Sequence, residues 1–325
     1  MDERYQRQML MPEIGAAGQE RLARARVLVV GVGGLGCAAV PYLAGAGVGE
    51  LVLVDPDRVS LSNLHRQTLY RTEQIGALKV TLVREFLLGL NPRLRIEALP
   101  LRLGAADAAR LVAGVDLVLD AADSFAATYL LSDACRAVRC PLVSASVVGL
   151  QGYVGVFCGR APSYRAVFPE LPQAAGSCAD SGVLGSAVGV LGALQAQFAL
   201  ATLVGWEPQV QGRMVTVDLR TLHFGGFSFA RAPEPAGDEL PFIDRASVTP
   251  QDAVIDLRAA AEAPEQAFAQ ARRLSVQELE ERGPGCVEPG ARVVLCCRSG
   301  LRAWRAARSL QRRGFHNVAL LALGE

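Results

Sequence analysis

The strongest constraint on the fold is a glycine-rich loop between an apolar segment and a helical pattern. The apolar segment is 26–30 (RVLVV), and the loop reads Gly31-Val-Gly33-Gly34-Leu-Gly36. Glycines let the backbone approach phosphate oxygens, and the N-terminus of the following helix offers amide donors and a positive dipole end. The loop therefore predicts a βαβ unit with a nucleotide phosphate at its first turn. NAD, FAD and ATP sites all use such loops.

Apolar segments alternate with helical patterns over the first two thirds of the chain. The segments that read as strands are 26–30, 51–55, 116–120, 142–148 and 153–157, and the helical patterns are 35–46, 72–90, 105–112 and 124–138. This alternation is typical of an α/β fold with a doubly wound, mostly parallel sheet. Two later segments, 213–218 and 222–227, read as a hairpin that closes the domain.

A second, smaller α/β domain is expected at the C-terminal end. Residues 230–246 are rich in proline with scattered charges, which is typical of a linker. Beyond them, 253–257 and 292–296 read as buried strands. We therefore expect a first domain over 1–229 and a second domain over 247–325.

Charge and cysteine usage exclude several classes of protein. The formal net charge is +1, so bulk charge gives no reason to expect binding to nucleic acid or to an anionic membrane. The N-terminus lacks a basic stretch that leads into an apolar segment, so we expect no secretory signal and a cytoplasmic protein with mostly free thiols. Residues 184–204 are uncharged and long enough to cross a bilayer. They contain Gln195 and Gln197 and lack flanking basic clusters, which favours a helix buried against a sheet or a partner subunit.

Side chains downstream of the glycine loop favour ATP over a dinucleotide. Asp55 ends the second apolar segment, where a carboxylate accepts hydrogen bonds from ribose hydroxyls. Lys79 is the single lysine among 33 basic residues, and a compact ammonium suits a triphosphate; the alternative is a surface lysine without a role in binding. We expect Asp120 to be structural, and Asp123 to hold Mg²⁺ against the phosphates or to cap the next helix.

Several motifs together resemble the ubiquitin-activating-type adenylyltransferases. They are 4–8 (RYQRQ), the glycine loop, 53–57 (LVDPD), 62–67 (SNLHRQ), Lys79 and 120–123 (DAAD), spread over roughly residues 2–227. They are most similar to the branch that activates sulfur carriers in molybdopterin and thiamine biosynthesis. The resemblance implies a Rossmann-like fold, the use of ATP with Mg²⁺, and adenylation of the C-terminal glycine of a small ubiquitin-like carrier that ends in Gly-Gly.

The same resemblance assigns residues to the nucleotide site. They are Gly31, Gly33, Gly34, Gly36, Asp55, Ser62, Asn63, Arg66, Lys79, Asp123 and Ser124. Among them, Asn63, Arg66 and Lys79 would contact the phosphates. Asp55 would hold the ribose, and Asp123 would organise magnesium.

The resemblance also bears on the oligomeric state, and the sequence differs from the family pattern at two places that concern metal binding. Arg7 matches an arginine that, in this family, reaches into the partner subunit's active site and stabilises charge during attack on the α-phosphate, which implies a homodimer. Ser124 follows the metal aspartate where the family often has asparagine. The paired C-x-x-C zinc motifs are missing, and 163–166 (SYRA) stands where the first pair would be. We therefore expect no zinc, and a loop held by packing instead.

The cysteines divide into buried and reactive candidates. Cys37, Cys135, Cys140 and Cys158 have apolar neighbours and are expected to be buried. Cys178 lies in a polar stretch ahead of the apolar helix, where the family carries a cysteine that can bond covalently to the carrier. The alternative is an incidental loop cysteine.

Cys297 begins a six-residue loop, 297–302 (CRSGLR), between a strand and a helix. Loop amides, two arginines and a helix N-terminus favour a thiolate there. Together with 256–258 (DLR), the loop resembles that of a rhodanese domain, whose loop cysteine carries a persulfide. The resemblance covers about 247–325, although 267–273 lacks the His and Gly of the usual segment. Cys296 is expected to face the other side of its strand.

These features imply a fused activator and sulfurtransferase. ATP would adenylate the carrier's C-terminal carboxylate, and a persulfide on Cys297, loaded by a donor such as a cysteine desulfurase, would supply sulfur for a thiocarboxylate. Cys178 would form an acyl link or a mixed disulfide between the two steps. Two alternatives stay open: an adenylyltransferase whose rhodanese-like unit is a non-catalytic docking module, and an NAD-dependent oxidoreductase on the same fold.

Overall fold

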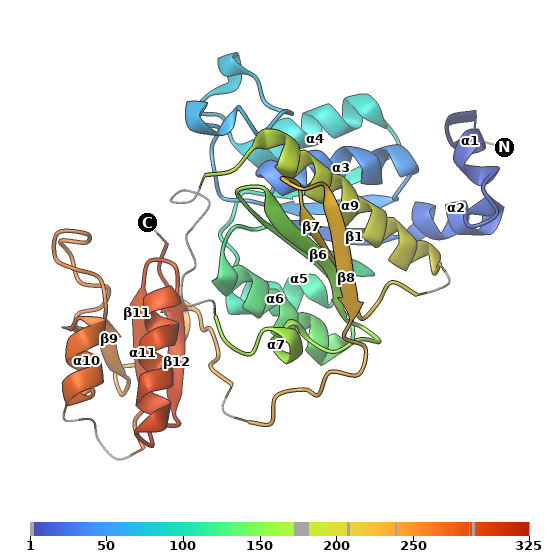
Figure 1. Cartoon of the computed structure of the whole chain (residues 1–325). Helices are drawn as coiled ribbons and strands as arrows, with labels where there is room; N and C mark the ends of the chain where they lie inside the picture. Colours follow the sequence, from blue (N-terminus) through green and yellow to red (C-terminus); the bar gives the residue numbers. More distant parts are fainter. Residues whose placement is uncertain are drawn as a thin grey trace.

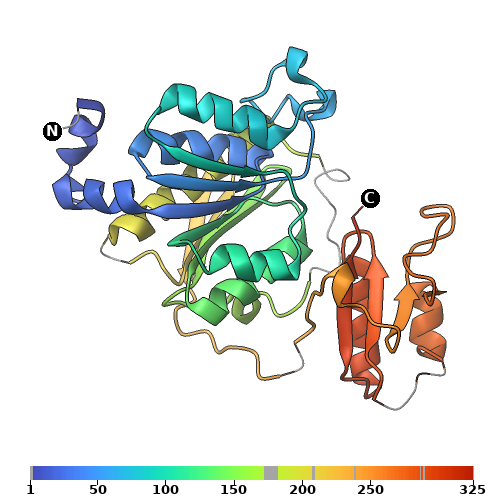
Figure 2. The same ribbon diagram turned by 180° about the vertical axis from the view of Figure 1, so that it is seen from behind.

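The computed structural model describes residues 3–171, 182–206, 209–237, 239–285, 287 and 290–324. It contains two sheets, each with its own helices (Figures 1 and 2). The strands of the first sheet are β1 (Arg26–Val30), β2 (Glu50–Val54), β3 (Arg95–Leu99), β4 (Leu117–Asp120), β5 (Pro141–Val148), β6 (Gln151–Cys158), β7 (Arg213–Asp218) and β8 (His223–Ser228). Their order is β3-β2-β1-β4-β5-β6-β7-β8.

The first sheet is parallel from β3 to β5 and antiparallel from β5 to β8. The chain moves outward from β1 to β3 and then returns to β4 beside β1. In open α/β sheets, ligands bind outside the carboxyl ends of the strands at such a reversal point. The doubly wound, mostly parallel sheet is confirmed, and the general rule for such sheets predicts a ligand site where β1 and β4 end.

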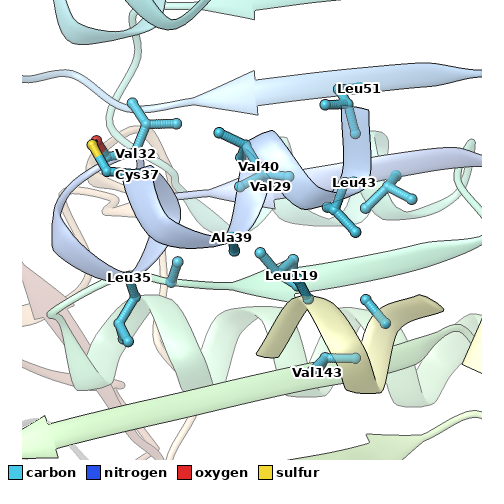
Figure 3. Packing of buried hydrophobic residues seen from close by; sticks show 14 of the residues in the cluster. Val29, Val32, Leu35, Cys37, Ala39, Val40, Leu43, Leu51, Leu119 and Val143 are labelled. Atoms are coloured by element: carbon cyan, nitrogen blue, oxygen red, sulfur yellow. The ribbon is translucent and has the colours of Figure 1, made fainter. Parts of the chain in front are cut away.

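Helices cover both faces of this sheet. One face carries α3 (Gly34–Ala46), α4 (Lys79–Leu90) and α9 (Gly185–Val204), and the other carries α5 (Ala105–Val112), α6 (Phe125–Val138) and the short α7 (Tyr164–Val167). Alternate residues of β1 face the two layers: Val29 packs under α3, while Leu28 packs on the side of α6. Figure 3 shows the first layer, where Val40 and Leu43 of α3 lie over the strands.

The apolar segment 184–204 forms α9. This helix is long and apolar enough to cross a membrane, and half of its apolar window is buried in the protein. Its contacts are with α3 and with β4, β5 and β6, and Gln195 donates to the carbonyls of Asp120 and Val143. The predicted packing of a buried helix against the sheet is therefore confirmed.

Two local expectations were wrong, and one strand was not predicted. The segment 153–157 lies in β6, which pairs antiparallel with β5 because the two are joined by a tight turn. The helical pattern 72–90 splits into a 3-10 turn (Thr72–Gln74) and α4. Strand β3 was not predicted; it is an edge strand with charged residues at two of its five positions and no fully buried residue.

The second sheet has four parallel strands in the order β10-β9-β11-β12. They are β9 (Ala253–Asp256), β10 (Arg272–Arg273), β11 (Val293–Cys297) and β12 (Val318–Ala322), with α10 (Val276–Arg282) and α11 (Leu301–Arg312). The two predicted strands and the last helix are present within a residue or two. The other elements were not predicted, although Ser275 and Glu278 form a capping box that signals the start of α10.

The proline-rich stretch between the two sheets is packed rather than free. Leu240 and Phe242 are buried. The carboxylate of Asp244 accepts hydrogen bonds from the amides of Ala105 and Ala106 at 2.6 and 2.7 Å, and so caps α5. The boundaries 1–229, 230–246 and 247–325 stay predictions about independent folding.

Candidate active site

The glycine loop connects β1 to α3 at the reversal point of the sheet. Gly31 has φ +91°, and a Cβ there would lie 2.5 Å from the carbonyl oxygen of Ala121, just after β4. A Cβ at Gly36 would lie 2.2 Å from the carbonyl oxygen of Gly31, and one at Gly34 would lie 2.6 Å from a methyl carbon of Val188 in α9. These glycines therefore permit tight packing of the loop on β4 and α9.

Asp55 connects the end of β2 to this loop. Its buried carboxylate accepts hydrogen bonds from the backbone amides of Val32 and Asp57, both at 2.8 Å. Burial raises the pKa of Asp55, while the nearby Lys79 charge and these hydrogen bonds oppose the increase. The carboxylate is thus fixed beside the glycine loop, and its contact with a ribose stays a prediction.

Lys79 is the first residue of α4, and its side chain is 3% exposed. Its Nζ donates to the carboxylate of Asp57 at 2.8 Å. The alternative of a surface lysine is wrong, because an ammonium buried this far needs a charged partner or ligand. The sequence did not predict this pairing with Asp57.

The segment 62–67 lies beside the loop as a set of polar side chains bonded to each other. Arg66 donates to Asn63 Oδ1 at 2.8 Å and to the carbonyl of Ser62 at 3.2 Å. Asn63 donates in turn to Ser60 Oγ at 2.7 Å. The stem of Arg66 lies next to Gly34, so its guanidinium is held near the start of α3 before a ligand binds.

Gln67 is the last residue of the 62–67 motif, and the structure gives it a specific position beside the glycine loop. Its side chain is 3% exposed, and its Nε2 lies 3.5 Å from the place of a Cβ on Gly33. Its Oε1 is buried without a hydrogen-bond partner among the described residues. A buried orphan acceptor is unfavourable until a donor arrives, so Gln67 is a candidate ligand contact.

The end of β4 carries the predicted aspartates. Asp120 is fully buried and accepts hydrogen bonds from Thr128 Oγ1, Ser144 Oγ and the Ala122 amide, which agrees with a structural role. Burial raises the pKa of Asp120 to about 6. Asp123 is exposed beyond it, and the residue at the N-cap position of α6 is Ser124, without a side-chain capping bond.

The donor set fits a magnesium ion that is bound mainly by its substrate. Among the described residues, no three His, Cys, Asp or Glu side chains gather as a metal cluster. Mg²⁺ is commonly held by one or two carboxylates together with substrate phosphates and waters. The exposed Asp123, at the same sheet edge as the glycine loop, can supply that carboxylate.

Arg7 belongs to the short helix α1 (Gln6–Met9), which lies at the end of the first domain farthest from the C-terminal unit (Figure 1). Beside it, Gln8 donates to the carbonyl of Ala46 at the end of α3, and Tyr5 accepts from Asn91 at the end of α4. The glycine loop is at the start of α3, so the structure does not bring Arg7 to the nucleotide edge of its own chain. Sequence reasoning placed it in a partner's site.

Residues 163–166, which stand where the family has its first C-x-x-C pair, make polar contacts with other parts of the chain. Ser163 caps α7 by accepting from the Ala166 amide, and its own amide and hydroxyl donate to Glu234 at 2.7 and 2.6 Å. Arg165 is buried and makes two hydrogen bonds, at 2.7 and 2.8 Å, to Asp133. The segment is therefore held by hydrogen bonds and an ion pair as well as by packing. The absence of zinc stays a prediction.

The cysteines separate as expected where the structure describes them. Cys37, Cys135, Cys140 and Cys158 are buried, and burial raises the pKa of Cys37 and of Cys158 to about 12. Cys178 lies outside the described residues.

Cys297 ends β11, and its fully buried Sγ accepts hydrogen bonds from the amides of Gly300 (3.2 Å) and Ala303 (3.4 Å). The loop amides thus surround the sulfur as predicted. Cys296 faces the other side of the sheet, where it donates to the carbonyl of Ile255. Burial raises the pKa of Cys296 to about 12, which agrees with its expected lack of reactivity.

Known proteins share this fold and much of this sequence. A model of the ThiF family matches residues 5–239. The sulfur carrier protein adenylyltransferase of Thermus thermophilus is 41% identical over 247 residues, which cover 73% of this chain and 91% of that protein. The adenylyltransferase and sulfurtransferase MOCS3 of Drosophila virilis is 42% identical over 225 residues, which cover 68% of this chain and 50% of that protein. This chain thus matches about half the length of that relative.

Solved structures agree on the fold. Escherichia coli MccB with ATP has a TM-score of 0.61 and 22% identity, covering 72% of this chain and 73% of that chain. MccB with MccA-N7isoASN has a TM-score of 0.64 and 22% identity, covering 72% and 74%. Because the family model spans well over half of the sequence and the Thermus relative covers more than two thirds of it, this chain belongs to the ThiF family.

Proposed function

We propose that the protein uses ATP to adenylate the C-terminal glycine of a ubiquitin-like sulfur carrier, and that its C-terminal unit then delivers sulfur to give a thiocarboxylate. The observation that carries the first half is the buried Lys79 beside Asp55 at the glycine loop. Two curated relatives carry names that state adenylyltransferase activity. Hydride transfer to NAD gives no reason to bury an ammonium at this place.

Different residues at the carboxyl ends of β1, β2 and β4 would bind different parts of the nucleotide. The N-terminus of α3 offers amides to phosphate oxygens, and Asp55 accepts from the ribose. Arg66 and Lys79 stabilise the negative charge that grows on the phosphates as the carrier carboxylate attacks the α-phosphorus and pyrophosphate leaves. The Asp57 carboxylate holds the Lys79 ammonium in place until the phosphates compete for it.

Magnesium would be held by Asp123 together with phosphate oxygens. The bound cation supplies charge neutralisation for the leaving pyrophosphate. Asp120 does not take part, because its carboxylate is engaged with Thr128 and Ser144 and fixes the β4–α6 connection. Its role is to hold the backbone that presents Asp123.

A homodimer would complete the site. Gln8, next to Arg7 in α1, bonds to Ala46 at the end of α3 that is opposite to the glycine loop, so Arg7 would act on a nucleotide bound by another chain. A two-fold dimer that brings α1 (Gln6–Met9) of one chain to the nucleotide edge of the other supplies this arginine. Stabilisation of the pentavalent α-phosphate is the chemistry that we assign to it.

The sulfur step uses the loop of Cys297. A donor such as a cysteine desulfurase would load this thiol to a persulfide. The terminal sulfur then attacks the acyl carbon of the adenylate, AMP leaves with its electron pair, and an acyl disulfide to Cys297 forms. A second thiol attacks the Cys297 sulfur, releases the carrier thiocarboxylate and leaves a disulfide that an external thiol reduces. The sequence offers Cys178 for this second attack, or for an acyl link with the carrier.

Carrier-dependent ATP–pyrophosphate exchange tests the adenylation. Small proteins that end in Gly-Gly should be supplied in turn with labelled pyrophosphate, and one of them should start exchange into ATP. A matched carrier lacking its last glycine is the control. No exchange with any carrier, or exchange that does not require the terminal glycine, contradicts the proposal.

Cys297→Ala tests the sulfur half. This variant should keep exchange unchanged and form no thiocarboxylate from a persulfide donor. Inorganic sulfide should restore part of the product, because it attacks the acyl-adenylate directly. Formation of thiocarboxylate at the normal rate from the persulfide donor would make the C-terminal unit a docking module.

A further inference from the structure

The buried part of the Cys297 loop, Cys297 and Gly300, packs against the stretch 230–246 and the first domain, while Arg298 and Ser299 of the same loop are exposed. A Cβ on Gly300 would lie 2.6 Å from a ring carbon of Phe242 and 3.6 Å from the Cβ of Ala126. Ala126 is the second residue of α6 and stands three residues after Asp123. The loop is thus covered by Phe242 and by the N-terminus of α6, and the Cys297 side chain is fully buried.

A second contact holds α11 in this position. Glu170 of the first domain accepts a hydrogen bond from Trp304 Nε1 at 3.3 Å and pairs with Arg308 at 3.0 Å. Arg308 also donates to the carbonyl of Pro169 at 3.0 Å. Trp304 and Arg308 are one turn apart on α11, the helix that follows the Cys297 loop. Glu170 therefore binds one face of this helix at two positions. Figure 1 shows α11 and β12 in the part of the C-terminal unit nearer to the first domain, with α10 on the far side.

Aromatic packing extends the same contact. The Trp304 ring lies 4.9 Å from the ring of Tyr129 in α6, and the Arg165 guanidinium lies over both rings. Trp304 is 2% exposed, whereas the Glu170 side chain is 62% exposed. Glu170 is therefore the part of the contact that can be changed without disturbing either core.

We propose that Glu170 is a positioning residue for sulfur transfer: it holds α11 on the first domain so that the Cys297 loop lies at the nucleotide edge, closed to solvent, and this contact opens when Cys297 is loaded. The positioning role and the opening on loading rest on the proposed function, whereas the closure over the Cys297 thiol does not. The closed contact places the loop at the N-terminus of α6, the helix that follows Asp123. It also covers the thiol, so an external sulfur donor reaches Cys297 only after α11 separates from Glu170.

Alkylation of the full-length protein with iodoacetamide tests the closure without ATP, carrier or sulfur donor. Glu170→Arg places a like charge against Arg308, and it should raise the alkylation rate of Cys297 about tenfold, as read by fragment-ion mass spectrometry. The double variant with Arg308→Glu restores an opposite pair and should return the rate towards that of the parent. Glu20→Gln, in an exposed pair with Arg24 far from this contact, is the control and should change nothing.

Cys296 is an internal control on the same strand. It faces the opposite side of the second sheet, away from the contact with the first domain. Separation of α11 exposes Cys297 alone, whereas unfolding of the C-terminal unit exposes both thiols. Equal alkylation of Cys297 in the parent and in Glu170→Arg overturns the closure, and so does a parallel rise at Cys296.

A single-turnover measurement tests the positioning. Protein preloaded with labelled sulfur on Cys297 should pass it to the adenylated carrier several-fold more slowly in Glu170→Arg, with pyrophosphate exchange unchanged. Unchanged transfer in a variant whose Cys297 alkylates faster overturns the positioning role. If the parent protein shows no pyrophosphate exchange, the proposed adenylation is contradicted. The alkylation measurement does not depend on adenylation, so its result still tests the closure.

Discussion

The Nζ atom of Lys79 lies 2.8 Å from the Asp57 carboxylate, with the lysine buried and the aspartate 57% exposed. The Lys79 ammonium is therefore inside the candidate nucleotide site, and the Asp57 carboxylate is at its solvent-exposed edge. Approaching phosphates can take over the ammonium while Asp57 turns to solvent, so the lysine is stabilised before the substrate arrives and is available afterwards.

The first prediction concerns this ammonium. Lys79→Met keeps the apolar stem and removes the charge, and we expect pyrophosphate exchange to fall about 10²–10³-fold, since one preorganised cation next to the transferred group is lost. Circular dichroism should show an intact fold. Arg84→Met, on the exposed side of the same helix α4, is the matched control. Exchange at the parent rate would remove the nucleotide assignment of Lys79.

The second prediction uses the orphan oxygen of Gln67. Gln67→Leu removes a buried acceptor that has no partner among the described residues, so the free energy of unfolding should stay equal or rise. The affinity for ATP should fall about tenfold, since a hydrogen bond to the nucleotide is lost. Equilibrium binding and denaturant titration measure the two effects separately. Gln197→Leu, on the exposed side of α9, should change neither; unchanged ATP affinity in Gln67→Leu would show that the nucleotide does not satisfy this oxygen.

The sequence predicted which segments form the candidate nucleotide site, but not which side chains in it contact each other. The loop from Gly31 to Gly36 has a local signal, because strand, glycines and helix follow each other directly. The Lys79–Asp57 pair depends on how the chain between the two residues folds back, and spacing alone does not reveal it. The burial of Gln67 is likewise a tertiary property, since the same residue in a polar motif reads as exposed.

The second unit shows the same limit. Strand alternation correctly separated Cys296 from Cys297, because it needs only the local period of two. The cover over Cys297 could not be predicted, since it comes from Phe242 and Ala126 on other parts of the chain. Stretch 230–246 reads as a linker by composition, yet its Leu240 is buried between elements distant in sequence.

The third prediction concerns pH. Burial raises the pKa of Asp120 from the ordinary 3.8 to about 6, so the folded protein binds this proton more tightly than the unfolded chain. The corresponding stabilisation is fully present below about pH 4 and is lost as pH rises through 6, a change of about 2–3 kcal/mol. Asp120→Asn should flatten the fall of the unfolding free energy between pH 4.5 and 7. Denaturant titrations at both pH values check this, and parallel pH profiles for the two proteins would contradict it.

The fourth prediction concerns residues 163–166, the segment where the family has its first C-x-x-C zinc pair. Asp133→Ala removes the carboxylate partner of the buried Arg165 guanidinium and leaves it a hydrogen bond to the carbonyl of Leu240, and we expect a loss of about 2 kcal/mol in the free energy of unfolding. Chelation with EDTA should leave the thermal midpoint of the parent unchanged, because the contacts that hold this segment are polar side chains. Asp107→Asn, in an exposed pair with Arg110, is the control. One zinc per chain in elemental analysis, or a midpoint lowered by EDTA, would contradict the zinc-free expectation.

The fifth prediction separates action within one chain from action between two. Gln8, the neighbour of Arg7, bonds to the end of α3, whereas the glycine loop, which we propose binds the nucleotide together with Lys79, is at the start of that helix. We expect Arg7→Ala and Lys79→Met each to abolish most exchange when tested alone. In a mixed dimer, one site combines the intact Arg7 of one chain with the intact Lys79 of the other, while the second site carries both defects. Unfolding and refolding an equal mixture should therefore restore about a quarter of the parent sites, since half of the dimers are mixed and each has one working site. If Arg7 acted within its own chain, each site in every dimer would carry one defect and mixing would restore nothing.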